Sequence, residues 1–155
     1  MWKWKEIQKV SRGVIDMQDF TKKMTIVVRE DVASWQLTNT VGHIAAYLGN
    51  KMSEPFDTGE SFTSKDGKNF PRNSQYGIVV LRASKDELKD LSGKLQNSGL
   101  SWIMYVQEMI DMIDDSELAR ALQAVSSEEM NLLGIGLFGP KDILKELTSV
   151  LKLWK

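Results

Sequence analysis

The chain has 155 residues, a formal net charge of −1, one histidine and no cysteine. This length predicts one domain that buries enough surface to fold without a disulfide or a metal. The lack of cysteine excludes thiolate metal sites and thiol catalysis. The near-neutral charge argues against a strongly basic nucleic-acid binder, and no apolar run approaches the ~20 residues of a membrane span. Since no signal-peptide core is present either, we expect a cytoplasmic protein with no membrane partner.

Residues 1–22 form an N-terminal segment that we predict to be helical. Trp2, Trp4, Ile7 and Val10 recur at near-helical spacing, and Arg12-Gly13 would end the helix. Exposed tryptophans are unusual unless they dock on the body of the protein or on a partner chain. Of these two interpretations, packing on the chain's own domain is favoured.

Residues 23–155 alternate between strand and helix patterns. Four short apolar runs, rich in β-branched residues, predict buried strands near 23–29, 76–82, 101–106 and 131–138. Helical patterns follow them near 34–48, 84–97, 107–130 and 140–154. This alternation predicts a single α/β domain with helices on both faces of the sheet.

Several predicted boundaries have their own sequence signals. Ser34 could cap the first helix, and Gly49-Asn50 would end it. Ser84 and Glu87 match a capping box. Pro140 opens the last helix, because proline at the first helical position loses no needed hydrogen bond. The apolar stripe of that helix is Ile143, Leu144, Leu147, Leu151 and Trp154.

The connection between residues 53 and 74 is long and polar. Its Asp66-Gly67 pair is a strong turn signal between Phe62 and Phe70, so it predicts a small hairpin. A loop of this length in a compact domain is commonly functional or mobile.

The first predicted strand runs into three charged residues, Arg29, Glu30 and Asp31. In open α/β sheets, ligands bind at the carboxyl ends of the strands. Arg29 and Asp31 could therefore hold an anion and orient a water molecule. The alternative is a surface ion pair worth about 0–1 kcal/mol, which is at least equally favoured.

Five further residues are candidates for a site. Lys23 could meet a phosphate or carbonyl oxygen, or be a solvated lysine at the start of its strand. His43 could act as a general base near pH 7, although flanking the apolar face of its helix is the favoured interpretation. Asn39 could point into a pocket or into solvent, and Gly134 and Gly136 could admit a ligand or only a packed helix. No phosphate loop, dinucleotide fingerprint, metal cluster or nucleophile elbow is present, so we expect no cofactor and no metal.

Two stretches resemble known proteins. The segment from Lys23 to Asp31 resembles the opening of the type II peptidyl-tRNA hydrolases, and the segment from Leu133 to Pro140 resembles their carboxyl end. The fuller resemblance, through Trp35-Gln36 and the later loop and strand, is to the sister family called domain of unknown function two-thousand. It covers roughly residues 23–153. It implies a peptidyl-tRNA hydrolase II-like fold, a three-layer α/β/α sandwich with a mixed four-stranded sheet, which is often dimeric.

The catalytic pattern of the hydrolases is not complete in this chain. They carry an aspartate-alanine-glycine-x-threonine segment before the last strand, and its aspartate and threonine serve catalysis with the first-strand lysine. Nothing between residues 106 and 131 matches it. Only Lys23 and, loosely, Asp31 and His43 carry over as catalytic candidates.

Two functions follow from this partial match. We favour the binding of a small ligand or protein partner in a cleft over Arg29, Asn39 and Gly136, without the family's full catalytic set. The alternative is a peptidyl-tRNA hydrolase, an esterase that cleaves the bond between peptide and tRNA. In that case Lys23 would grip the substrate, and Asp31 or His43 would help a water molecule to attack.

Charge and aromatic content predict two further properties. Residues 107–130 hold seven acids and one arginine, a net charge of −6, which should repel tRNA if the segment lines the cleft beside Lys23. Trp2, Trp4 and Trp154 give apolar surface at both ends of the chain. Together with the resemblance, they predict a homodimer.

Overall fold

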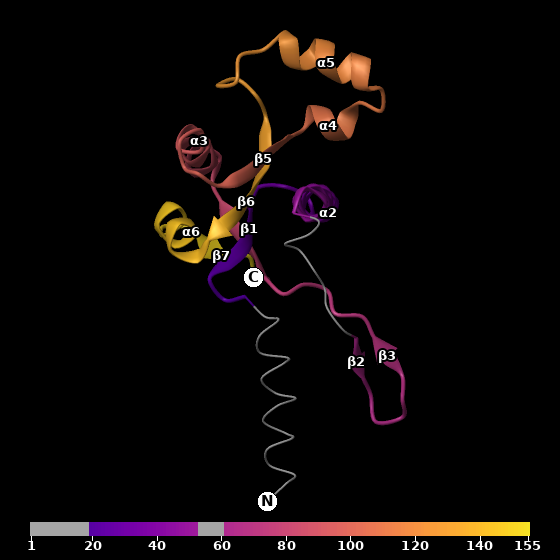
Figure 1. Cartoon of the computed structure of the whole chain (residues 1–155). Coiled ribbons are helices and arrows are strands. Elements are labelled where there is room, and N and C mark those ends of the chain that lie inside the picture. The colour runs from indigo at the N-terminus through magenta and orange to yellow at the C-terminus, as the bar shows by residue number, and fades with distance from the viewer. Residues whose placement is uncertain (1–18, 53–60) are drawn as a thin grey trace, which may run out of the picture.

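The computed structural model describes residues 19–52 and 61–155. Its centre is a mixed five-stranded sheet in the order β5-β6-β1-β4-β7 (Figure 1). β1 is parallel to β4 and antiparallel to β6, and the edge strands β5 and β7 are both antiparallel to their neighbours. The predicted N-terminal helix falls almost wholly outside the described residues. The strands are β1 (Lys22–Arg29), β4 (Gly77–Ala83), β5 (Ser101–Val106), β6 (Leu132–Pro140) and β7 (Lys152–Leu153).

The central strand is β1, as its β-branched apolar run predicts. Met24 through Val28 are all buried. The strand forms ladders with β6 on one side and β4 on the other, and the Glu30 N–H extends the second ladder with a 2.9 Å hydrogen bond to the Ala83 carbonyl. A strand that is covered on both faces must be apolar on both, which explains why its sequence does not alternate.

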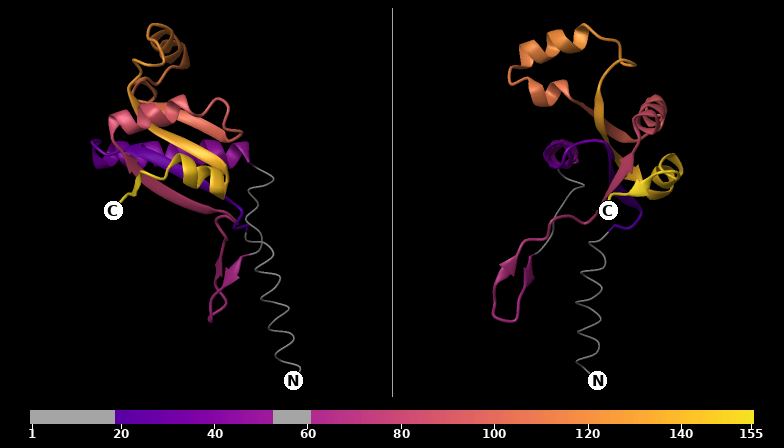
Figure 2. Two further views of the ribbon diagram at one scale, coloured as in Figure 1. Left: turned by 90° about the vertical axis from the view of Figure 1, so that its left-hand side faces the viewer. Right: turned by 180° about the vertical axis from the view of Figure 1, so that it is seen from behind.

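Helices cover the two faces of the sheet (Figures 1 and 2). α2 (Ser34–Lys51) lies on one face, and α3 (Lys85–Gly93) and α6 (Lys141–Leu147) lie on the other. The sheet therefore separates two apolar cores. The core under α2 includes Met24, Ile26, Val28, Ile44 and Leu48, and the core on the opposite face includes Val27, Leu81, Leu88, Leu91 and Leu144.

Two glycines of β6 let α2 approach the sheet closely. A Cβ atom at Gly136 would lie 2.2 Å from Ile44 Cγ2 and 2.9 Å from Leu48 Cδ1, and one at Gly134 would lie 2.7 Å from Thr40 Cγ2. Real Cβ contacts are not this short, so a larger side chain would push the helix away. The helix occupies the space that a side chain would otherwise fill.

The sheet has five strands instead of the expected four. Lys152 and Leu153 pair with Arg82 and Leu81 of β4, and the Trp154 N–H donates to the Val80 carbonyl at 3.0 Å. The predicted helix to residue 154 is therefore wrong, because α6 ends at residue 147. Without β7, the backbone groups on that side of β4 would have no strand partner among the described residues, which is costly where they are shielded from water.

One of the two predicted N-terminal helix caps is confirmed and the other is wrong. Ser84 and Glu87 form the predicted capping box, with the Ser84 hydroxyl accepting from the Glu87 N–H at 3.2 Å and Glu87 Oε2 accepting from the Ser84 N–H at 2.8 Å. Ser34 does not cap α2. Ala33 occupies the N-cap position, and its N–H donates to Gln36 Oε1 at 2.9 Å. α2 also continues through the predicted stop at residues 49–50 to Lys51.

Two excursions leave the sheet (Figure 2). One is the predicted hairpin, β2 (Phe62–Thr63) and β3 (Asn69–Phe70), whose turn includes Gly67 at φ 84°. The left-handed conformation favours glycine there. The other excursion, α4 (Glu108–Asp111) and α5 (Asp115–Gln123), joins β5 to β6 beyond the sheet end.

Replacing glycine by alanine should have opposite effects at two positions. Gly136→Ala should lower the free energy of unfolding by about 1–3 kcal/mol, because the added methyl group overlaps Ile44 and Leu48. Gly42→Ala, in the middle of α2 with nothing within 4 Å, should raise it by about 1 kcal/mol through helix propensity. Urea unfolding of both variants measures the difference. A Gly136→Ala variant as stable as the parent would contradict the close packing of α2.

Candidate functional site

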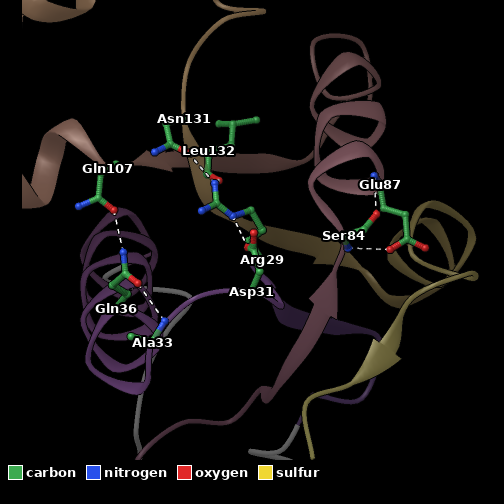
Figure 3. A network of polar contacts seen from close by, with 9 residues as sticks. All are labelled: Arg29, Asp31, Ala33, Gln36, Ser84, Glu87, Gln107, Asn131 and Leu132. Carbon is green, nitrogen blue, oxygen red and sulfur yellow. Dashed lines mark hydrogen bonds and ion pairs between the residues drawn. The ribbon is translucent and has the colours of Figure 1, made fainter.

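The chain leaves β1 and β4 toward opposite faces of the sheet. These two strands are neighbours and parallel, but β1 leads to α2 on one face and β4 leads to α3 on the other. Such a divergence is a topological switch point, and ligands of open α/β sheets bind outside the carboxyl ends of the strands at that place. Figure 3 shows the polar side chains that gather at this edge.

A crevice of about 330 Å³ lies at the switch point. Residues from four elements or their ends meet there: the turn after β1, the end of β4, the first turn of α3, and the segment that enters β7. The lining residues are Glu30, Arg82, Ser84, Glu87, Val150, Leu151 and Lys152. We call this the switch-point crevice.

Two cations are opposed across the strands that border this crevice. Arg82 of β4 and Lys152 of β7 are direct partners in the antiparallel register. Opposed residues have Cβ atoms about 4.5–5.5 Å apart, and like charges in this position destabilise the pair. Neither cation has an ion-pair partner among the described residues, where the Arg29–Asp31 pair stands alone. This opposed pair of cations is the main electrostatic feature of the crevice.

Acidic and apolar groups complete the crevice wall. One carboxylate oxygen of Glu87 already accepts a hydrogen bond, from the Ser84 N–H. Glu30 is exposed, and it follows β1 directly. Val150 and Leu151 supply the apolar side. These two acids offset the two cations in formal charge.

Sequence reasoning pointed to this edge of the sheet but did not predict the opposed cations Arg82 and Lys152. Arg82 and Lys152 are 70 positions apart, and their pairing depends on β7, a two-residue strand with no apolar run to reveal it. The one sequence signal for this cation was that Arg82 ends a predicted strand, two residues before Ser84 of the capping box.

Arg29 is already bound within the protein. Its Nη1 donates to Asn131 Oδ1 at 2.5 Å and to the Leu132 carbonyl at 3.1 Å, and its Nε donates to Asp31 Oδ1 at 2.5 Å (Figure 3). Its side chain is 14% exposed, whereas that of Asp31 is 66% exposed. Arg29 thus ties the end of β1 to the start of β6.

Asn39 and His43 meet on the side of α2 that faces β5. The Tyr105 hydroxyl donates to Asn39 Oδ1 at 3.0 Å, and the His43 ring stacks on the Tyr105 ring with centroids 5.3 Å apart and an interplanar angle of 18°. Burial raises the pKa of Tyr105, which keeps its phenol neutral and able to donate. One turn earlier, Gln36 Nε2 donates to Gln107 Oε1 at 2.9 Å. This polar side of α2 holds the helix against β5 and α4.

Lys23 lies at the opposite end of β1 from the switch-point crevice. It pairs with Gly77 and Gly139 at the amino end of the strand, whereas Asp31 follows the carboxyl end. The strand from Lys23 to Arg29 alone spans roughly 20 Å. The structure therefore does not bring Lys23 together with Asp31. The acidic segment also leaves from the Val106 end of β5, at the carboxyl edge of β1, so it does not flank Lys23.

The part of the chain that the structure describes lacks two other features. It contains no cluster of three or more histidine, aspartate or glutamate side chains placed to hold a metal ion. None of its helices is long and apolar enough to cross a membrane.

The fold and crevice define an open, mixed α/β domain with a polar site at a switch point. The chain belongs to the DUF2000 family, since the family described as "Protein of unknown function (DUF2000)" matches residues 22–155. Its fold is similar to that of the protein of unknown function Atu0240 from Agrobacterium tumefaciens str. C58, with a TM-score of 0.76 and 20% sequence identity. The match covers 88% of this chain and 100% of that one. At this identity the likeness shows the fold alone. No curated protein matches the sequence.

A double-mutant cycle should separate the partners of Arg29. Arg29→Met and Asn131→Ala should couple by about 0.5–3 kcal/mol in the free energy of unfolding, because their hydrogen bond is partly buried. Arg29→Met and Asp31→Ala should couple by no more than about 1 kcal/mol, because Asp31 is exposed. Urea unfolding of the single and double variants gives both terms. Equal coupling energies would contradict the assignment of Arg29 as a tie between β1 and β6.

Proposed function

We propose that this protein binds a small molecule carrying one anionic group, in the switch-point crevice. The observation that carries this proposal is the Arg82–Lys152 pair, two cations in direct cross-strand register with no ion-pair partner among the described residues. A carboxylate or phosphate monoester between them would replace a repulsion by two charge-assisted hydrogen bonds. Arg82 is half-buried, which strengthens its electrostatic interactions relative to those of a fully solvated group.

The rest of the crevice restricts the ligand. The apolar side made by Val150 and Leu151 suits a short hydrocarbon part. Glu30 lies where it could accept a hydrogen bond from an amino or hydroxyl group of the same molecule. A volume of about 330 Å³ fits a small molecule better than a folded macromolecule.

Our sequence-based ligand residues would support this site indirectly. Arg29 fixes the end of β1, next to Glu30, and Asn39 fixes α2 through Tyr105. Gly134 and Gly136 allow α2 to lie close to β6. Through these contacts the four residues would preserve the geometry of the strand ends without touching the ligand.

The alternative function, peptidyl-tRNA hydrolysis on a hydrolase-like fold, lacks an assembled centre. Water attack on an ester needs a base and oxyanion donors at one place. Lys23 lies at one end of β1, whereas Asp31 lies beyond the other end and His43 stacks on Tyr105. Purified protein should therefore release no labelled peptide from peptidyl-tRNA. Turnover that Lys23→Ala abolishes would support the alternative.

The anion site predicts an unusual relation between binding and stability. Lys152→Gln should raise the free energy of unfolding in anion-free buffer by about 0.2–1 kcal/mol, because it removes the like-charge pair. The same change should abolish ligand-induced stabilisation. Inorganic phosphate and acetate are the probes: each should raise the melting temperature of the parent protein, and the rise should grow with the logarithm of its concentration once that exceeds the dissociation constant.

A matched variant controls for general charge effects. Lys89→Gln makes the same charge change on the exposed surface of α3, away from the crevice, and should retain the response to both probes. Amide NMR shifts on titration should cluster at residues 82–87 and 150–152 in the parent protein. Responses equal in the parent and Lys152→Gln, or shifts scattered over the surface, would refute the anion site.

A further inference from the structure

The outer edge of β5 has no strand partner among the described residues. β5 pairs only with β6, and the sheet ends there. The backbone groups that point away from β6 form a row of unpaired donors and acceptors, which is a template for another strand. Natural edge strands are usually protected from such pairing by charge, proline or very short length.

The two edges of this sheet differ in that protection. β7 has two residues, and one of them is Lys152. β5 has six residues, Ser-Trp-Ile-Met-Tyr-Val, with no charge and no proline. Its one irregularity lies between Tyr105 and Val106, at the end of the strand, so the first five residues keep a regular edge. Of the two edges, β5 is the one open to pairing.

The side of α2 nearest β5 continues this surface. His43 is exposed and stacks on Tyr105 of β5. Tyr47 lies four residues later, on the same side of the helix, and it is 43% exposed. Trp102, Ile103 and Met104 of the strand are themselves only partly buried. An exposed aromatic ring therefore lies beside a neutral strand edge.

We propose that β5 pairs antiparallel with β5 of a second copy of this chain across a two-fold axis. The two five-stranded sheets would then join into one continuous sheet of ten strands. When a strand pairs with its own copy about a two-fold axis perpendicular to the sheet, opposed residues point to the same face. The axis must then lie at a residue and not between two residues. Near the middle of β5 that residue is Ile103 or Met104. Tyr47 and His43 of each copy would approach the partner over one face and add side-chain area to the strand ladder.

A second copy fits this edge because the edge is self-complementary in charge. Antiparallel self-pairing brings no like charges together, since residues 101–106 are all neutral. A two-fold interface also needs only one kind of surface, which must match itself. This dimer is independent of the anion site, which lies at the carboxyl ends of β1 and β4.

Single cysteines provide the first test, since the natural chain contains none. Each of residues 101–106 is replaced by cysteine in turn in the full chain, and the purified variants are oxidised and run on non-reducing gels. Cross-linked dimer should peak at Ile103→Cys or Met104→Cys and fall away at Ser101→Cys and Val106→Cys, because only residues beside the axis meet their own copies. Leu153→Cys, on the opposite edge, should give no dimer. Equal cross-linking at every position would overturn the proposed register.

Added charge gives the second test. Ser101→Lys and Tyr47→Lys place lysine on the proposed interface at positions that are at least partly exposed. Light scattering at tens of micromolar should show a dimer for the parent protein and for Leu153→Lys, and at least a tenfold weaker dimer for the double variant. Circular dichroism checks that the variants fold. A monomeric parent protein, or a dimer that both lysines leave unchanged, would overturn the proposal.

Discussion

The structure depends on the pairing of β1 with strands on both sides. Its ladder with β4 is parallel, which requires a crossover, and α2 lies in that crossover. Its ladder with β6 is antiparallel, and it places Gly134 and Gly136 beneath α2. Burial of β1 on both faces thus determines where the helix lies and how closely it packs. It also places the carboxyl ends of β1 and β4 side by side, which creates the switch point.

Much of this framework could be predicted from the sequence. The four principal strands were predicted within two residues at either end, because short apolar runs bounded by polar residues or glycine have few alternatives in an α/β pattern. β7 was missed for a physical reason. Leu151 and Trp154 match the spacing of the preceding helix, but the unpaired side of β4 offers backbone hydrogen bonds that the helical spacing does not reveal. A two-residue strand is defined by its partner and not by its own sequence.

The candidate site was less predictable than the fold. The rule that ligands bind at strand carboxyl ends pointed to the edge where the crevice lies, since Glu30 is among its lining residues. The rule could not tell which cation is free. Arg29 and Arg82 end neighbouring parallel strands and look equivalent in the sequence. Only the fold shows that Arg29 meets three acceptors, whereas Arg82 faces Lys152.

The two arginines differ in how the described residues satisfy them, which supports the proposed binding role of Arg82. A guanidinium group that serves the fold is matched by protein acceptors, because leaving it half-buried and unmatched costs stability. Arg29 meets this condition through Asp31, Asn131 and the Leu132 carbonyl. Arg82 has no such acceptor among the described residues, and the opposed lysine adds to the cost. The cost of the unmatched Arg82 guanidinium is explained if a ligand supplies a negative charge beside it. Stability and binding should then change in opposite directions when Lys152 is neutralised.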